Sequence, residues 1–285
     1  RPSRMALLPQ MVPQNEIANA VAVGGTIWQL NRLAGPAFAG MMIYIAGVAP
    51  TYVFCFAASV VSLGLWLAIR IEYVRPPAAP GGLLTHMAEG LSFIRKNEIF
   101  YTFIGMTFFN SVFGMSYLIL MPVFARDILH AGSQGFGFLQ STGGAGALAG
   151  TLAVAYFSHK AGRVRQAFLG AIVFGILLIL FAFSRSYPVS LGLAFLLGFA
   201  SQSYMTIINS TLQLNLPERL RGRVMGIFGL TWDLMPVGGM VSGTIAEFAG
   251  APAAVALGGV LVAGLAAAVI ALRPGLAHAA DHGPV

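Results

Sequence analysis

The stretch QAFLGAIVFGILLILFAFSRSYPVSLGLAFLLGFA (166–200) decides the fold class, because only the short segment SRSY (184–187) divides its two long apolar runs. A helix needs about 20 mostly apolar residues to cross the hydrocarbon core of a bilayer. The whole 285-residue chain follows this composition, with 57% hydrophobic and 9% charged residues and a mean hydropathy of +0.80. A soluble domain carries about 25% charged residues. The chain is therefore predicted to be an all-α, polytopic membrane helix bundle.

Eight apolar runs are long enough to span a membrane. Their predicted bounds are 17–46, 49–71, 99–125, 134–157, 164–184, 188–214, 221–248 and 251–272. Helices are expected because each spanning segment must satisfy its own backbone hydrogen bonds in lipid, and a membrane barrel would show short alternating segments. Residues 1–12 are interpreted as the end of an earlier helix, so the bundle is expected to be N-terminally truncated.

The lysines and arginines are distributed very unevenly between the loops. Two of the 16, Arg126 and Arg185, fall on one side of the predicted membrane, and Arg32 falls inside a span. The other thirteen share the opposite side: Arg1, Arg4, Arg70, Arg75, Arg95, Lys96, Lys160, Arg163, Arg165, Arg219, Arg221, Arg223 and Arg273. The positive-inside rule then predicts a multi-pass protein of the cytoplasmic (inner) membrane with both ends of this chain in the cytoplasm. The net charge of +7 is explained by this topology, so no nucleic-acid partner is expected.

The predicted spans divide the chain into four parts. Residues 1–72 hold the end of an N-terminal half, 73–98 a cytoplasmic linker, 99–273 a six-helix C-terminal half and 274–285 a cytoplasmic tail. The linker opens with prolines and glycines and continues as an amphipathic segment. This segment is expected to lie on the inner membrane surface.

An internal repeat relates the two halves. The segment VPQNEIANAVAVGGTIWQ (12–29) aligns with LPERLRGRVMGIFGLTWD (216–233) at an offset of 204, so that Trp28 meets Trp232. Further on, AGVAP (46–50) matches AGAP (249–252) with a slip of one residue. Parallel repeats are a construction principle of many transporters, whose substrate site lies at the repeat interface.

Five segments carry a resemblance to a known family. They are RPSRMALLPQMVP (1–13), LNRLAGPAFAG (30–40), EGLSFIRKN (89–97), LMPVFARDIL (120–129) and LPERLRGRVMGIF (216–228). Their order and spacing resemble the major facilitator superfamily, and more narrowly the transmembrane secretion effectors grouped with the enterobactin exporter. The resemblance implies twelve helices, of which this chain holds the end of the fourth and the fifth to the twelfth. It also implies efflux driven by proton antiport.

Two motifs of the family are imperfect in this chain. The cytoplasmic loop of the second half, which usually resembles Asp-Arg-x-Gly-Arg, reads His-Lys-Ala-Gly-Arg at 159–163 and so lacks the acidic residue. The antiporter signature of the fifth helix keeps Gly35, Pro36 and Gly40, but Ala39 replaces one glycine. Gly35 and Pro36 also predict a helix kink on physical grounds.

Two charges lie deep inside predicted spans, Arg32 and Asp233. A charge at the bilayer centre costs at least about 2.5 kcal/mol, so it normally faces a cavity or a partner. Asp233 is a candidate proton carrier, and Arg32 is a candidate for substrate or gating contact. The alternative is that each is neutralised or paired for packing alone.

Polar side chains form a stripe along each of two predicted spans. Gln202, Thr206, Asn209 and Gln213 share one helical face, and by resemblance their span is the tenth helix, which lines the central cavity. A similar stripe contains Thr107, Asn110, Gly114 and Tyr117, flanked by Phe109 and Phe113. These stripes predict a partly aromatic, partly polar substrate cavity for an amphipathic compound. The alternative is hydrogen bonding between helices.

Two cytoplasmic loops supply the predicted gate. Its candidate residues are Gly162, Arg163, Glu218, Arg221 and Arg223. Ordinary flanking charge is the alternative for the arginines. A third feature, the glycine-rich run with Gly143, Gly144, Gly146 and Gly150, predicts close helix packing.

The function predicted from these features is secondary active export of small amphipathic molecules, siderophore or drug-like, by proton antiport with alternating access. An importer or facilitative carrier of the same fold is the alternative, and a non-transporting membrane scaffold is a third reading. Hydrolase motifs and a P-loop are missing from the sequence, so no enzyme activity, cofactor or metal is expected. The expected partners are the small-molecule substrate, protons and the lipid bilayer, with a monomeric protein that is inactive without the upstream helices.

Overall fold

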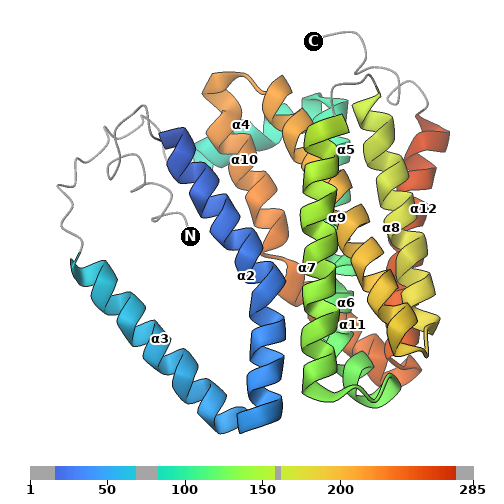
Figure 1. The fold of residues 1–285 in the computed structure, drawn as a ribbon. Coiled ribbons are helices and arrows are strands. Elements are labelled where there is room, and N and C mark those ends of the chain that lie inside the picture. Colours follow the sequence, from blue (N-terminus) through green and yellow to red (C-terminus); the bar gives the residue numbers. More distant parts are fainter. Residues whose placement is uncertain (1–16, 69–82, 158–161, 274–285) are drawn as a thin grey trace. The chain divides into compact units, whose positions relative to one another are not determined.

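The computed structural model describes residues 17–68, 83–157 and 162–273, and every regular element in these ranges is helical (Figure 1). The prediction of an all-α membrane bundle is confirmed in this part of the chain. Three of the sequence-based expectations lie outside the described residues: the helix end at 1–12, residues 159–161 of the loop without its acidic residue, and the tail at 274–285.

The chain divides into two compact units. The first contains residues 1–80 and 133–141, and the second contains 81–132 and 142–285. The helix in the described part of the predicted linker, α4, belongs to the second unit together with most of the C-terminal half.

The first unit is built from two long helices and the beginning of a third. Helix α2 covers Ile17–Ala46 and α3 covers Val48–Ala68, and α7 (Gly132–Phe157) contributes its first residues. Gly47 joins α2 to α3 with a φ of +84°, a backbone conformation that favours glycine.

The second unit contains the remaining helices. They are α4 (Leu83–Lys96), α5 (Glu98–Phe109), α6 (Ser116–Val123), most of α7, α8 (Arg163–Phe183), α9 (Tyr187–Asn215), α10 (Glu218–Trp232), α11 (Met235–Ala249) and α12 (Ala251–Leu272). The π-helical turn η2 (Asn110–Gly114) joins α5 to α6, and a second π-helical turn, η3 (Phe124–Ile128), follows α6. Together these elements form one span of 31 residues. The span formed by α10 and α11 has 32 residues and is broken near its middle.

Six helices or joined helices in the described ranges are long and apolar enough to cross a membrane. They correspond to six of the eight predicted spans. The other two predicted spans are also helices, α2 with 30 residues and α7 with 26, but they are less apolar. The reason is visible in their sequences, because α2 contains Asn19, Asn31 and Arg32 and α7 is rich in glycine and uncharged polar residues.

Glycines allow the helices of the second unit to pack closely. A Cβ on Gly175 of α8 would lie 2.5 Å from the carbonyl oxygen of Gly259 of α12, and a Cβ on Gly259 would lie equally close to the Gly175 carbonyl. Between α7 and α9, a Cβ on Gly150 would lie 2.5 Å from the Phe199 carbonyl oxygen, and Gly146 faces the Phe195 carbonyl even more closely. The predicted packing role of the glycine-rich run is confirmed in the second unit.

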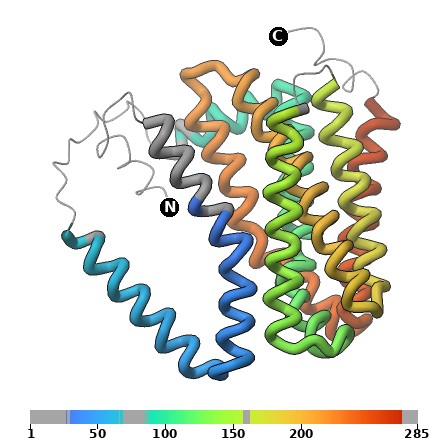
Figure 2. Tube along the Cα trace, viewed as in Figure 1, coloured from blue at the N-terminus to red at the C-terminus, as the bar shows by residue number. Residues whose placement is uncertain are grey.

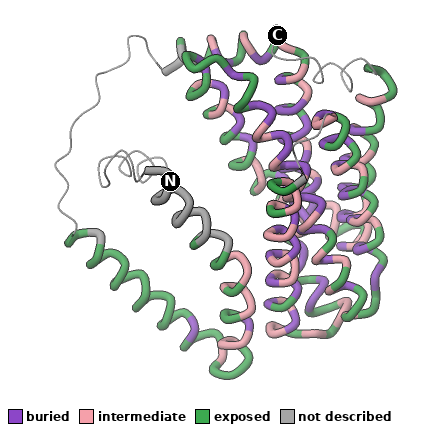
Figure 3. Tube along the Cα trace, turned by 45° about the horizontal axis from the view of Figure 1, so that its top comes forward, coloured by how far each residue is buried: buried purple, intermediate pink, exposed green. Residues whose placement is uncertain are grey.

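The interior of the second unit is apolar and aromatic. Figure 2 follows the chain through this unit, and Figure 3 shows that the buried positions concentrate where its helices face one another. Phe124 and Phe181 pack with ring centroids 5.1 Å apart, and Phe103 packs against Phe168 at 6.0 Å. Helices that are distant in sequence therefore share one core in the second unit.

Candidate functional site

The two charges predicted inside spans both lie near the middle of their helical segments. Arg32 is half-buried in α2, within the first unit. Asp233 is exposed at the break between α10 and α11, where its backbone N–H donates to the Leu230 carbonyl oxygen at 3.2 Å. A carboxylate at an interrupted helix combines a titratable group with backbone that has left the regular hydrogen-bonding pattern, an arrangement that transporters use at ion sites.

The proline of α2 has a polar neighbour that compensates for it. Pro36 lies inside the helix, and Figure 1 shows that α2 changes direction along its length. The N–H of Ala37 donates to the Ser141 hydroxyl of α7 at 2.9 Å, and a Cβ on Gly137 would lie 2.5 Å from the Pro36 carbonyl oxygen. Close packing by glycine and one serine hydroxyl thus holds the first turns of α7 against the proline segment of α2.

The polar stripe on α9 lies on a partly open face of its helix. Gln202, Thr206 and Asn209 are half-buried and Gln213 is exposed. Within the stripe, the Thr206 hydroxyl donates to the Gln202 carbonyl oxygen at 2.7 Å, and the Gln213 amide donates to the Asn209 side-chain oxygen. The stripe therefore satisfies part of its own hydrogen-bonding capacity and still presents polar groups along the span.

The second stripe lies in a different environment, the interior of the second unit. Thr107, Asn110 and Tyr117 are all buried. The Thr107 hydroxyl donates to the Phe103 carbonyl oxygen at 2.9 Å, and the Tyr117 ring packs against Phe174 and Phe181. Phe109 and Phe113 are half-buried and pack against each other at 4.7 Å. The structure thus separates the two predicted stripes, and a substrate role for the buried stripe stays a prediction.

A π-helical turn at Asn110–Gly114, which was not predicted from the sequence, interrupts this buried span. Three glycines make room for the turn. A Cβ on Gly114 would overlap the Asn110 side chain, one on Gly238 of α11 would overlap the Val112 carbonyl oxygen, and one on Gly258 of α12 would overlap the Phe113 carbonyl oxygen. Two of these glycines, Gly238 and Gly258, lie on other helices, so no local pattern predicted the turn. Such π turns occur frequently at functional sites.

Helix α4 is fastened to the first half of α10. Arg223 of α10 forms an ion pair with Glu89 of α4, and a Cβ on the adjacent Gly90 would lie 3.4 Å from the Arg223 backbone. Glu218 and Arg221, the other predicted gate residues of α10, are exposed. The structure therefore supplies Glu89 as the acidic partner of Arg223. The sequence analysis did not propose this pair, because its two members are distant in sequence.

The predicted gate residues of the other loop lie at the start of α8. Gly162 has a φ of +91° and caps α8, and its carbonyl oxygen accepts the Gln166 N–H at 2.9 Å. Arg163 follows it and is half-buried. The positive φ explains why a glycine stands here in the sequence.

Basic residues gather at one end of the second unit. The end of α4, the starts of α8 and α10 and the end of α12 lie there, and Arg273 after α12 pairs with Glu98 at the start of α5 (Figure 1). Arg126 and Arg185 belong to the opposite ends of their helices. The helix directions thus give the second unit one strongly basic end.

Comparisons with known proteins agree with this architecture. A family model described as transmembrane secretion effector matches residues 1–283. The multidrug efflux pump Tap of Mycolicibacterium fortuitum is 25% identical over 258 residues, which cover 87% of this chain and 62% of Tap. The Tap pump of Mycobacterium tuberculosis strain H37Rv is 27% identical over 79% of this chain and 54% of its own length.

A third relative is similar over much the same share of this chain. The staphyloferrin A transporter of Staphylococcus aureus is 23% identical over 87% of this chain and 62% of its own length. The chain thus spans less than two thirds of the length of these relatives. Because the family model covers nearly the whole chain, the chain belongs to the transmembrane secretion effectors of the major facilitator superfamily.

Proposed function

We propose that this chain forms the larger part of a secondary active transporter that exports small amphipathic molecules, siderophore or drug-like, by proton antiport. The observation that carries the proposal is the α9 stripe, whose polar residues from Gln202 to Gln213 stay half-buried or exposed along a membrane-spanning helix. Lipid disfavours such a face, so it serves a water-accessible path. The relatives include proteins named as a multidrug efflux pump and a staphyloferrin A transporter, which supports this substrate class.

The proposed orientation follows from the basic end of the second unit. That end, which includes Arg163, Arg221 and Arg273, faces the cytoplasm according to the positive-inside rule. Both ends of this chain are then cytoplasmic, and the protein acts as a monomer in the cytoplasmic membrane.

The proposed proton carrier is Asp233. It lies at a mid-span helix break, where a carboxylate can exchange a proton with water on one side and then on the other. Arg32 of α2 is the proposed second charge of the path, in contact with an anionic substrate or in gating.

The proposed gate lies at the basic end. The ion pair of Glu89 with Arg223 ties α4 to α10, and α10 leads directly to Asp233. Alternating access requires that such a contact form in one state and open in the other, so the pair stabilises the state in which the basic end is closed.

Everted membrane vesicles test this function. The protein is expressed together with an upstream segment of the kind its longer relatives carry, and respiration builds a proton gradient. Siderophores and amphipathic dyes are then added one at a time while gradient dissipation is recorded. The native protein is compared with Asp233→Asn and with Glu247→Gln, a matched control that neutralises another exposed carboxylate of the same span.

The proposal expects dissipation that depends on the compound, disappears in Asp233→Asn and persists in Glu247→Gln. Dissipation that survives in Asp233→Asn removes this residue as the carrier and leaves antiport in place. If compounds cross the membrane without changing the gradient, antiport is wrong and a facilitative carrier is the better description.

A further inference from the structure

Asn110 and Tyr204 are two of the buried polar side chains of the second unit that have no hydrogen-bond partner. Asn110 is 1% exposed, and neither its Nδ2 nor its Oδ1 atom has a partner. Tyr204 is also 1% exposed, and its hydroxyl has none. A buried donor or acceptor without a partner costs about 1–3 kcal/mol, so such groups in a native protein call for an explanation.

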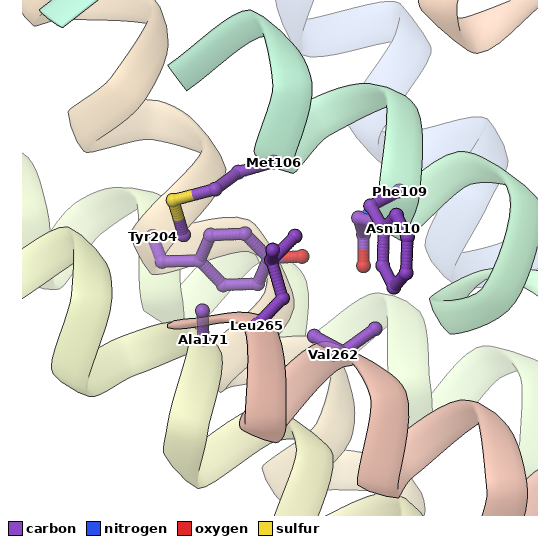
Figure 4. A pocket seen from close by; sticks show the side chains of 7 residues that line it. All are labelled: Met106, Phe109, Asn110, Ala171, Tyr204, Val262 and Leu265. Carbon is purple, nitrogen blue, oxygen red and sulfur yellow. The ribbon is translucent and has the colours of Figure 1, made fainter. Parts of the chain in front are cut away.

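Both side chains line the same small cavity. Met106, Phe109 and Asn110 contribute from the α5–η2 segment, and Tyr204 comes from α9. Ala171 of α8 and Val262 and Leu265 of α12 complete the lining. Figure 4 shows the Tyr204 hydroxyl directed toward the Asn110 carboxamide, with apolar side chains around the two polar groups.

The size of the cavity restricts its occupant. Its volume is about 10 Å³, which is close to the space that one water molecule needs. A transported compound or a hydrated ion does not fit. An apolar cavity of this kind would stay dry, but a carboxamide and a phenol hydroxyl together offer a water molecule the two to four partners that buried waters have.

The surrounding backbone keeps the Asn110 carboxamide in this place. Asn110 begins the π-helical turn, and its side-chain oxygen lies against Gly114, where any Cβ would overlap it. On the other side, a Cβ on Gly170 of α8 would lie 2.7 Å from the Tyr204 Cβ, so α8 packs directly on the base of the tyrosine. The two polar groups are thus fixed by their neighbours with a gap between them.

We propose that this cavity is a binding site for one buried water molecule, which the Asn110 carboxamide and the Tyr204 hydroxyl hold by hydrogen bonds. The water satisfies side chains of the π-helical turn and of α9 at once and so connects two spans across the interior of the six-helix half. This site is separate from the partly open α9 stripe and does not depend on the proposed transport function.

X-ray radiolytic footprinting in water labelled with oxygen-18 tests the site. Radiolysis of a bound water produces hydroxyl radicals that oxidise the side chains next to it, and mass spectrometry locates the products. The whole chain is studied in lipid nanodiscs. Met106 lines the cavity, whereas Met121 is buried to a similar degree and does not. The proposal expects several-fold more oxidation of Met106 than of Met121.

Variants then identify the groups that hold the water. The double variant Asn110→Leu and Tyr204→Phe keeps the shape of the site and removes its polar atoms, so Met106 oxidation falls to the Met121 level. Thr107→Val is the matched control, because this neighbouring hydroxyl already donates to Phe103 and does not line the cavity. Tyr204→Phe alone replaces the double variant if the latter does not fold, with a partial loss expected.

Two results overturn the proposal. If native Met106 is oxidised no more than Met121, the cavity is dry. If Met106 is oxidised strongly but equally in the native chain and in the variants, a water is present and these two side chains do not hold it.

Discussion

The internal repeat gives two comparable helix pairs. One pair is α2–α3 in the first unit, and the other is α10/α11–α12 in the second unit. The first helical segments have 30 and 32 residues, and the second helices have 21 and 22. In each copy a glycine turns the chain between the two segments, Gly47 with a φ of +84° and Gly250 with a φ of +86°. The repeat seen in the sequence therefore extends to helix length and turn geometry.

The two copies differ in how much of their apolar surface is buried. Only 6% of the apolar window of α3 is buried, against 28% for α12. Helix α12 packs tightly on α8 through Gly259 and Gly175, whereas a Cβ on Gly64 of α3 would meet no atom within 4 Å. A repeated sequence thus specifies the local structure of a helix pair, and the partners of the pair determine how strongly each residue is constrained.

The largest difference in stability between the two copies is expected for glycine substitutions in α3 and α12. Gly259→Leu places a side chain against the Gly175 carbonyl and forces α12 away from α8. Overpacking costs about 1–3 kcal/mol or more, so we expect a large fall in the yield of monodisperse protein and in its melting temperature. Gly64→Leu on α3 is the control and should leave both unchanged. Equal losses of yield and melting temperature in the two variants would contradict the difference in burial between α3 and α12.

The turn glycines should instead behave alike. Gly250 has φ and ψ of 86° and 154°, a region that only glycine occupies readily, and Gly47 shares its positive φ. Gly250→Ala should cost about 1–3 kcal/mol of unfolding free energy, measured by thermal or denaturant unfolding in detergent, and Gly47→Ala should destabilise its helix pair similarly. A harmless Gly250→Ala would show that the turn can adopt another conformation.

A smaller effect is expected where the two copies differ in charge. Arg223 of the second copy aligns with Asn19 of the first, so Arg223→Asn introduces the residue of the first copy and breaks the pair with Glu89. Both side chains are partly exposed, and such pairs contribute about 0.2–1 kcal/mol or less. Hydrogen exchange of α4 should accelerate by at most about fivefold.

The charge-swapped double variant, Glu89→Arg with Arg223→Glu, should restore slow exchange of α4. Unchanged exchange in Arg223→Asn would instead show that Gly90 and apolar packing alone hold α4 on α10.

The smallest effect on the fold is expected from a spin label on the single cysteine of the chain. Cys55 is exposed on α3, and a spin label there should leave the fold unchanged. In lipid, the label should collide frequently with oxygen, whereas a label at position 262 of α12, where Val262 is buried, should be shielded in a Cys55→Ala background. Equal shielding at both positions would contradict the exposure of α3. Protection of the Cys55 label after addition of an upstream segment would show that this segment covers α3.

The long helices were predictable from the sequence. An uncharged apolar run such as 188–214 must satisfy its own backbone hydrogen bonds in lipid, and a helix does so within one segment. The repeat and the kink at Pro36 were also visible. The π-helical turn at Asn110 was not, because its cause lies in Gly238 and Gly258 on other helices. The pairing of Glu89 with Arg223 likewise depends on the tertiary contact of α4 with α10.

The two polar stripes show the same limit for the site. On the sequence, Thr107, Asn110 and Tyr117 were indistinguishable from the α9 stripe, because periodicity shows that residues share a face and does not show what the face meets. In a membrane helix the usual contrast is weak, since lipid-facing and core-facing surfaces are both apolar. Only the packing of α5 against α8, α9 and α12 separates the buried stripe from the open one.

Transport in proteoliposomes tests directly whether a proton gradient drives the proposed export of a small molecule by this protein. The protein, preceded by an upstream segment of the kind its relatives carry, is reconstituted with a compound identified in the vesicle assay, and a proton gradient is imposed as the only energy source. If the protein is a proton-driven exporter, the compound accumulates against its own gradient and a protonophore abolishes the accumulation. A compound that reaches equal concentrations on both sides, whatever the proton gradient, would contradict it.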